Sequence, residues 1–116
     1  MTESDLQRGV IDTAQALGYL VSHFRPARVM RGGREIYETP VAADGKGFPD
    51  LVLVKPGRLI FAELKSAAGT VAPAQQGWLD ALACAPCETY VWRPIDWTSG
   101  LIERVLRARG KPDEPG

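Results

Sequence analysis

Two apolar runs separated by a short turn sequence constrain this chain more than any other feature. Leu51-Val52-Leu53-Val54 and Leu59-Ile60-Phe61-Ala62 flank Lys55-Pro56-Gly57-Arg58. Pro-Gly favours a turn and the apolar runs favour strands, so the segment predicts a β-hairpin. Both runs are apolar at every position, which is typical of strands that are covered on both faces. Such a sheet needs flanking helices.

The remaining pattern supplies these helices. A helix is expected from about Glu3 to Leu17, with Thr2 or Ser4 as its N-cap and Gly18 at its end. A strand over 19–24, a helix over 73–82, a strand over 88–93 and a helix over 96–109 are also expected, while 25–47 is irregular apart from a possible short strand at 35–39. This order predicts an α/β fold of three layers, with a mixed central sheet flanked by helices.

Length and charge limit the kind of protein. The chain has 116 residues, which suits one domain, and its formal net charge of +0 argues against coating nucleic acid by bulk charge alone. No apolar run approaches the ~20 residues that cross a bilayer, and the polar N-terminus is unlike a secretory signal. We therefore expect no membrane contact and an intracellular location, in the cytoplasm of a cell or of a virus-infected host.

Cys84 and Cys87 form a C-x-x-C pair. An intracellular location predicts that both are reduced. The pair follows an expected helix instead of preceding one, so the helix dipole does not favour a reactive thiolate, and no second pair exists to complete a zinc site. Ordinary packing is the preferred interpretation.

The hairpin register brings three charged residues together. A turn centred between Pro56 and Gly57 places Asp50 opposite Glu63, and Lys65 lies two residues further along the same face. Because a type II Pro-Gly turn suits a two-residue hairpin poorly, a four-residue loop with the same centre is expected. The register predicts two carboxylates and one ammonium group at the open end of the hairpin.

Two carboxylates at this spacing repel each other unless something neutralises them. A proton, Lys65 or a divalent cation could do so, and oxygen ligands on strands suit Mg²⁺ or Mn²⁺. Such a cation can activate water and orient a phosphodiester, and a lysine can stabilise developing negative charge. The alternative interpretation is a surface ion pair among Asp50, Glu63 and Lys65.

The motifs around these residues resemble a known nuclease family. Phe48-Pro49-Asp50 followed by Glu63-Leu64-Lys65 resembles the PD-(D/E)-x-K signature. Together with Gln75-x-x-Trp78-Leu79-x-x-Leu82 and Val91-Trp92-Arg93-Pro94, the ordered set resembles the VRR-NUC family of that superfamily. The resemblance implies a restriction-endonuclease-like fold, with residues 1–110 as one nuclease domain and 111–116 as a flexible tail.

The resemblance also implies roles in the site. Asp50, Glu63 and the backbone carbonyl of Leu64 would bind the metal, and Lys65 would be the catalytic lysine. Glu3 would complete the acidic cluster, although its position alone reads as a solvated acid at the start of a helix. Gln75 would face the site from the following helix.

The family's small stand-alone members resemble Holliday-junction resolvases, so the resemblance implies a homodimer that cuts branched DNA. The chain departs from the family in its longer segment 29–46, which would bind DNA phosphates or reach a partner subunit. The expected DNA contacts are Arg25, Arg28, Arg31, Arg34, Lys46 and His23. Two alternatives stay open: a nuclease for flaps, nicks or duplex DNA, and a non-catalytic DNA-binding or interaction module.

Overall fold

A four-stranded mixed sheet organises the chain. The computed structural model describes residues 1–24, 27–38 and 43–111. The strand order is β1-β4-β5-β6, in which β1 pairs antiparallel with β4, β4 antiparallel with β5, and β5 parallel with β6. These strands span Leu20–His23 (β1), Leu51–Lys55 (β4), Arg58–Leu64 (β5) and Glu88–Trp92 (β6).

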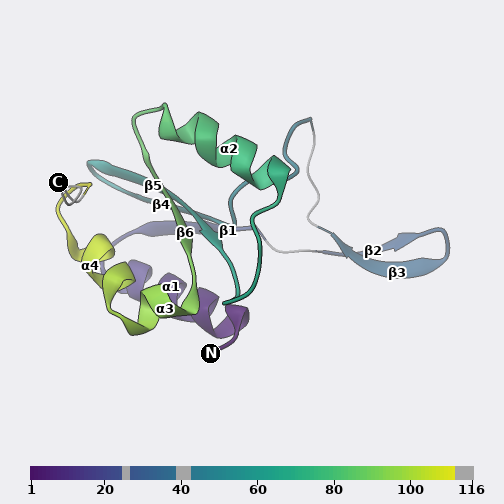
Figure 1. Ribbon diagram of the computed structural model, residues 1–116, viewed down its shortest axis with the longest axis horizontal. Helices are drawn as coiled ribbons and strands as arrows, with labels where there is room; N and C mark the ends of the chain where they lie inside the picture. Colours follow the sequence, from purple (N-terminus) through teal and green to yellow (C-terminus); the bar gives the residue numbers. More distant parts are fainter. Residues whose placement is uncertain (25–26, 39–42, 112–116) are drawn as a thin grey trace.

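Helices lie on both faces of this sheet. One face is covered by α1, α3 and α4, and α2 lies across the other (Figure 1). They span Glu3–Ala16 (α1), Pro73–Ala83 (α2), Pro94–Thr98 (α3) and Leu101–Arg107 (α4). The mixed α/β fold, with a mixed sheet and helices, is as the sequence predicted. No helix in the described ranges is long and apolar enough to span a membrane.

The first helix starts where the sequence predicted. Thr2 is its N-cap, because the Thr2 hydroxyl accepts from the Asp5 amide at 3.0 Å and the Asp5 carboxylate accepts from the Thr2 amide at 2.9 Å. Reciprocal bonds of this kind satisfy amides that the helix leaves open. Leu6, Val10 and Ala14 are its buried face.

The prediction that residues 25–47 are irregular was wrong in part. Strands β2 (Ala27–Arg31) and β3 (Arg34–Glu38) form a separate antiparallel hairpin, so the possible strand at 35–39 has a partner that was not expected. Gly32 and Gly33 connect the two strands with φ of 56° and 75°. A two-residue turn with positive φ at both positions matches the twist of a hairpin, and a Gly-Gly pair is its sequence signal.

Two further expectations were wrong. The helix expected over 96–109 is two helices, because Gly100 adopts φ of 81° between α3 and α4. The break changes which residues face inward: Leu101 is exposed, whereas Ile102 is buried with Val105. The β4–β5 loop has two residues instead of four, since Lys55 pairs directly with Arg58 and Gly57 takes φ of 83°.

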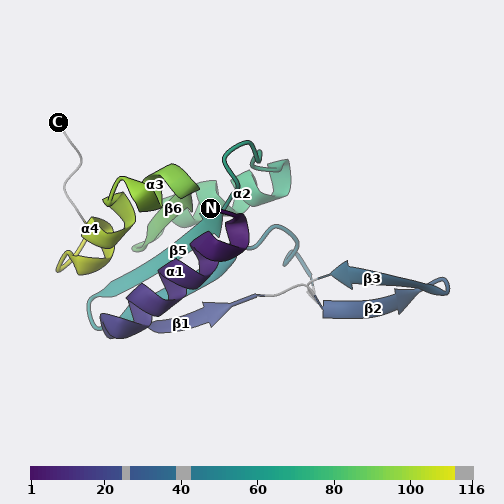
Figure 2. The same cartoon turned by 90° about the horizontal axis from the view of Figure 1, so that it is seen from below.

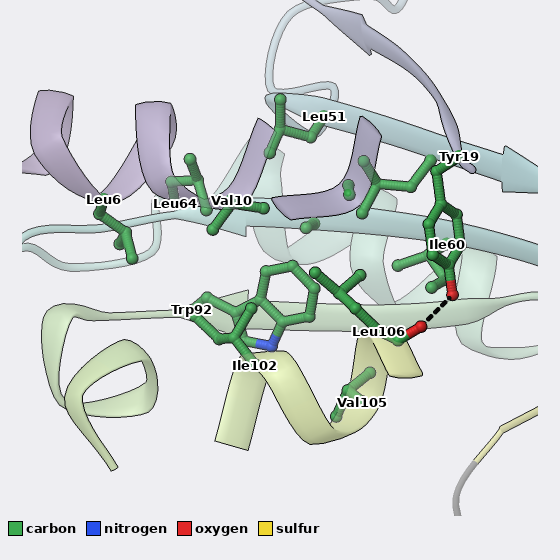
Figure 3. Packing of buried hydrophobic residues seen from close by; sticks show 13 residues of the cluster. Leu6, Val10, Tyr19, Leu51, Ile60, Leu64, Trp92, Ile102, Val105 and Leu106 are labelled. Carbon is green, nitrogen blue, oxygen red and sulfur yellow. Dashed lines mark hydrogen bonds between the residues drawn. The ribbon is translucent and has the colours of Figure 1, made fainter. Parts of the chain in front are cut away.

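The core lies between the sheet and the face formed by α1, α3 and α4. Leu51 and Leu53 of β4 face it, and Trp92 of β6 is among its largest fully buried side chains. Figure 3 shows Trp92 packed among apolar side chains from the strands and from α4. The opposite face is covered less completely, because Val54 is 38% exposed, so the prediction of burial on both faces holds only near α2.

A buried polar network closes the end of the core nearest the β4–β5 turn. Arg58 Nε and Nη2 donate to the two carboxylate oxygens of Glu88 at 2.9 and 2.6 Å. Arg58 Nη1 also donates to the backbone carbonyls of Val105 and Ala108 and to the Tyr19 hydroxyl. That hydroxyl donates to the Leu106 carbonyl at 2.9 Å (Figure 3). One guanidinium therefore connects β5, β6, the start of β1 and the end of α4.

Candidate active site

The hairpin register brings Asp50 and Glu63 together as predicted. Leu51 pairs with Ala62, so Asp50 and Glu63 occupy the next opposite positions. The Oδ2 atom of Asp50 accepts a hydrogen bond from the Leu64 amide at 2.9 Å. This bond holds the Asp50 carboxylate across the end of β5, beside Glu63.

The second carboxylate is buried. Glu63 is only 2% exposed, and its Oε1 accepts from Gln75 Nε2 at 3.1 Å. Its Oε2 has no hydrogen-bond partner among the described residues. A buried carboxylate oxygen without a partner is costly, so this atom is a place for a proton or a cation.

Burial, and after it the neighbouring Asp50 carboxyl, raise the pKa of Glu63 to about 8. The Lys65 ammonium opposes that rise, and Glu3 adds to it. Without a cation, the site holds a proton near neutral pH in place of a second negative charge.

Lys65 is held in the site by Gln75. The Lys65 Nζ donates to Gln75 Oε1 at 2.8 Å and lies 3.8 Å from Glu63 Oε1. Gln75 Oε1 also accepts from the Ala72 amide at 2.8 Å at the start of α2. The Gln75 side chain therefore bridges the N-terminus of α2, Lys65 and Glu63.

The loop before Asp50 is pressed against α2. Gly47 has φ of 87°, and a Cβ at this position would lie 2.6 Å from the Ala74 carbonyl carbon. Phe48 packs edge-on against Phe24, Phe61 and Trp78 at centroid separations of 5.0 to 5.9 Å. The G-F-P-D segment is therefore packed against α2 and the neighbouring aromatic rings, and this packing positions Asp50.

The structure gathers the acidic candidates only in part. Within the described ranges, no three His, Cys, Asp or Glu side chains come close enough to hold one metal ion. The carboxylates that adjoin each other are Asp50 and Glu63, next to the Leu64 backbone. Glu3 as a further metal ligand stays a prediction.

The candidate DNA contacts lie in several places. His23 lies in β1, where Gln7 Nε2 approaches its Nδ1 at 3.4 Å. Lys46 is exposed and lines an open cavity of about 550 Å³ beside Trp78. Arg34 is exposed in β3. Arg28 and Arg31 belong to β2, but their side chains are outside the described part of the structure, as is the whole of Arg25.

The cysteine pair lies at the end of α2, as expected. Cys84 is the C-cap residue and both thiols are free. The Cys87 thiol donates to the Leu82 carbonyl, and burial raises the pKa of Cys87. A raised pKa disfavours the reactive thiolate at Cys87, which packs at the helix end, whereas Cys84 is exposed.

Comparison with protein-family models, with curated proteins and with solved structures gives no match to this chain. The function is therefore inferred from the geometry of the site and from the motifs that form it.

Proposed function

We propose that this chain is a divalent-metal-dependent DNA endonuclease of the VRR-NUC kind, with Asp50, Glu63 and Lys65 as its catalytic residues. The observation that carries the proposal is the buried Glu63 carboxylate, which faces Asp50 while Lys65 is fixed beside it by Gln75. A restriction-endonuclease-like fold is part of this proposal. The strand order and the parallel pairing of β6 with β5 support it.

Mg²⁺ or Mn²⁺ fits the donors at this site. The Glu63 Oε2 atom, which has no partner in the described part of the chain, would hold the ion with the Asp50 carboxylate and the Leu64 carbonyl. All three are hard oxygen ligands. When bound, the cation supplies charge that activates water and stabilises the departing oxygen. Glu3 contributes negative charge from the start of α1 and is proposed as a further ligand.

Lys65 acts on the phosphodiester itself. The bond from Lys65 Nζ to Gln75 Oε1 fixes the ammonium group before substrate binds. A fixed positive charge lowers the barrier to hydrolysis because it stabilises the negative charge that develops on the phosphoryl oxygens. The alternative role is to orient the attacking water. A surface ion pair would need neither the burial of Glu63 nor the amide bridge.

We also propose that the enzyme acts inside the cell, as a homodimer on branched DNA. Each chain carries one Asp50–Glu63–Lys65 trio, and paired cuts across a symmetric junction need two sites. The support is the family resemblance and the small size of a single chain. Sedimentation of the purified protein would give its mass, and a monomer at all working concentrations would contradict the dimer.

Cleavage tests the function directly. The protein would be incubated with Mg²⁺ or Mn²⁺ and end-labelled four-way junction, flap, nicked and linear duplex DNA. Cleavage of at least one substrate is expected, and Lys65→Ala should slow it roughly 10²-fold or more, as loss of one stabilising group does in other enzymes. Lys55→Ala is the matched control, since Lys55 lies over the Tyr19 ring at the other end of the hairpin.

Two results would overturn the proposal. One is no cleavage of any substrate with either metal. The other is equal rates for Lys65→Ala and Lys55→Ala. Calorimetric titration of the wild-type protein with Mn²⁺ separates a nuclease from a non-catalytic module, since a module without the metal site would release no heat of binding.

A further inference from the structure

The β2–β3 hairpin stands apart from the rest of the chain. This arm, residues 27–38, extends along the longest dimension of the molecule, which measures 51 Å against 31 and 27 Å for the other two (Figure 1). Its two strands make extensive contacts only with each other. Figure 2 shows the same separation after a quarter turn. An isolated two-stranded hairpin is only marginally stable in water, so this arm is suited to lie against a partner.

The arm leaves the body beside the candidate active site. It projects from the end of the sheet opposite the β4–β5 turn, and the start of β4 and the end of β5 lie at this same end (Figure 1). The Phe24 amide, shortly before β2, donates to the Asp50 carbonyl at 3.1 Å. The Phe24 ring packs on Phe48 two residues before Asp50. A molecule bound along the arm would therefore pass the catalytic carboxylates.

The tip of the arm concentrates positive charge. Arg31 pairs directly with Arg34 in the register, on either side of the Gly32-Gly33 turn. Two arginines at paired positions of the register give the tip two charges of the same sign, which favours an anion there. The arm's two glutamates, Glu35 and Glu38, come after Arg34, nearer the body. The arrangement suits a polyanion that meets the tip first.

We infer that this arm enters the major groove of duplex DNA and holds the duplex at the active site, an inference that rests on the proposed function. The major groove, about 12 Å wide and about 8.5 Å deep, admits a two-stranded β-ribbon. Strands of five residues reach about 17 Å, so the tip meets the groove while the base of the arm stays outside it. Arg31 and Arg34 then bind phosphates at the groove edge.

Fluorescence anisotropy tests the arm. The probes are a labelled duplex of about 30 base pairs, which covers about three helical turns, and the matching single strand. EDTA is present to prevent cleavage. Arg31→Ala/Arg34→Ala should weaken duplex binding roughly tenfold and reduce the salt slope of log K by about two, because each lost phosphate contact removes about one. Single-strand affinity should change far less, since a single strand has no groove.

Two further variants make the result specific. Arg31→Glu/Arg34→Glu keeps like charges opposite each other at the tip, so hairpin stability is matched while duplex binding should fall further than in the alanine variant. Arg104→Ala/Arg109→Ala removes the same charge from exposed positions near the C-terminal end and should leave duplex binding unchanged. Thermal unfolding of each variant verifies that the fold is retained.

The inference is overturned if the alanine arm variant binds duplex like the wild type, or loses duplex and single-strand binding equally. It is also overturned if the arm variant changes the sedimentation mass and not DNA binding, which would assign the arm to a second copy of the chain. Failure of the nuclease proposal looks different. In that case duplex binding would still depend on the arm, but no substrate would be cut with Mg²⁺ or Mn²⁺.

Discussion

At the scale of single residues, the protonation of Glu63 links the site to stability. The pKa of Glu63 is raised to about 8 from its ordinary value of 4.5. Between these values the folded protein holds a proton that the unfolded chain has released. The free energy of unfolding of the metal-free protein therefore falls as pH rises through this window, by up to about 1.4 kcal/mol per pH unit.

Glu63→Gln tests this dependence, because an amide of similar shape cannot ionise. Urea unfolding in EDTA should show wild type losing stability relative to Glu63→Gln between about pH 5 and about pH 8. Parallel pH profiles for the two proteins would contradict the raised pKa. Addition of Mn²⁺ should restore wild-type stability at the higher pH, and should not stabilise Glu63→Gln to the same extent.

Gln75 holds the Lys65 ammonium group in position. Gln75→Ala removes the acceptor for Lys65 Nζ and for the Ala72 amide, so cleavage should slow at least ~10-fold and unfolding free energy should fall by about 1 kcal/mol. Gln76→Ala is the control, since the Gln76 side chain bonds only to exposed Asp80 among the described contacts. Equal cleavage rates for the two variants would remove Gln75 from the site.

At the scale of elements, the contact between the loop before Asp50 and α2 fixes the site. Gly47→Ala adds a Cβ 2.6 Å from the Ala74 carbonyl carbon in a backbone with positive φ, whereas Gly57→Ala has a similar φ with open space around it. Gly57→Ala should cost about 1 kcal/mol in unfolding free energy from backbone strain alone. Gly47→Ala should cost at least twice that and slow cleavage as well, because the loop must move.

Urea unfolding and cleavage assays on these two variants separate strain from displacement. If Gly47→Ala loses no more stability than Gly57→Ala and keeps the wild-type cleavage rate, the loop does not set the position of Asp50. The comparison is informative because the two glycines differ by only a few degrees in φ, 87° against 83°, and differ mainly in their surroundings.

At the scale of the whole molecule, Arg58 connects the C-terminal end of α4 to the sheet. Arg58→Met leaves the buried Glu88 without its charged partner and two backbone carbonyls without their donor, so unfolding free energy should fall by about 3–5 kcal/mol. Arg107→Met removes an exposed pair with Glu103 and should change it by less than about 0.5 kcal/mol. A loss below about 1 kcal/mol for Arg58→Met in urea unfolding would contradict this role.

The Arg58–Glu88 network gives the free energy of unfolding a second pH dependence, opposite in sign to that of Glu63. Burial raises the pKa of Glu88, but hydrogen bonds from Arg58 and Tyr90 lower it more, so the net shift is downward. Its stabilising contribution is present above the unfolded pKa and is lost as pH falls through the folded value. Stability should therefore decrease towards acid through Glu88 and towards base through Glu63.

The local part of the fold was predictable because it depends on near neighbours. The Pro-Gly turn between two apolar runs determines the hairpin and its register, which by itself places Asp50 opposite Glu63. The Thr2 cap and the apolar spacing determine α1 in the same way, and Pro73 in the first turn marks the start of α2. A local signal for β2 and β3 was also present in Gly32-Gly33, and a search for two-residue turns would have found that hairpin.

The sequence by itself determined which charged residues meet across the hairpin, because strand pairing with a short turn leaves one register. The tertiary structure decided what surrounds them. It buried Glu63, left Glu63 Oε2 without a partner among the described residues, and brought Gln75 from α2 onto Lys65. Burial and contacts between distant segments depend on how helices pack on the sheet, and no local pattern specifies that packing. The break at Gly100 and the Arg58 network were decided in the same way.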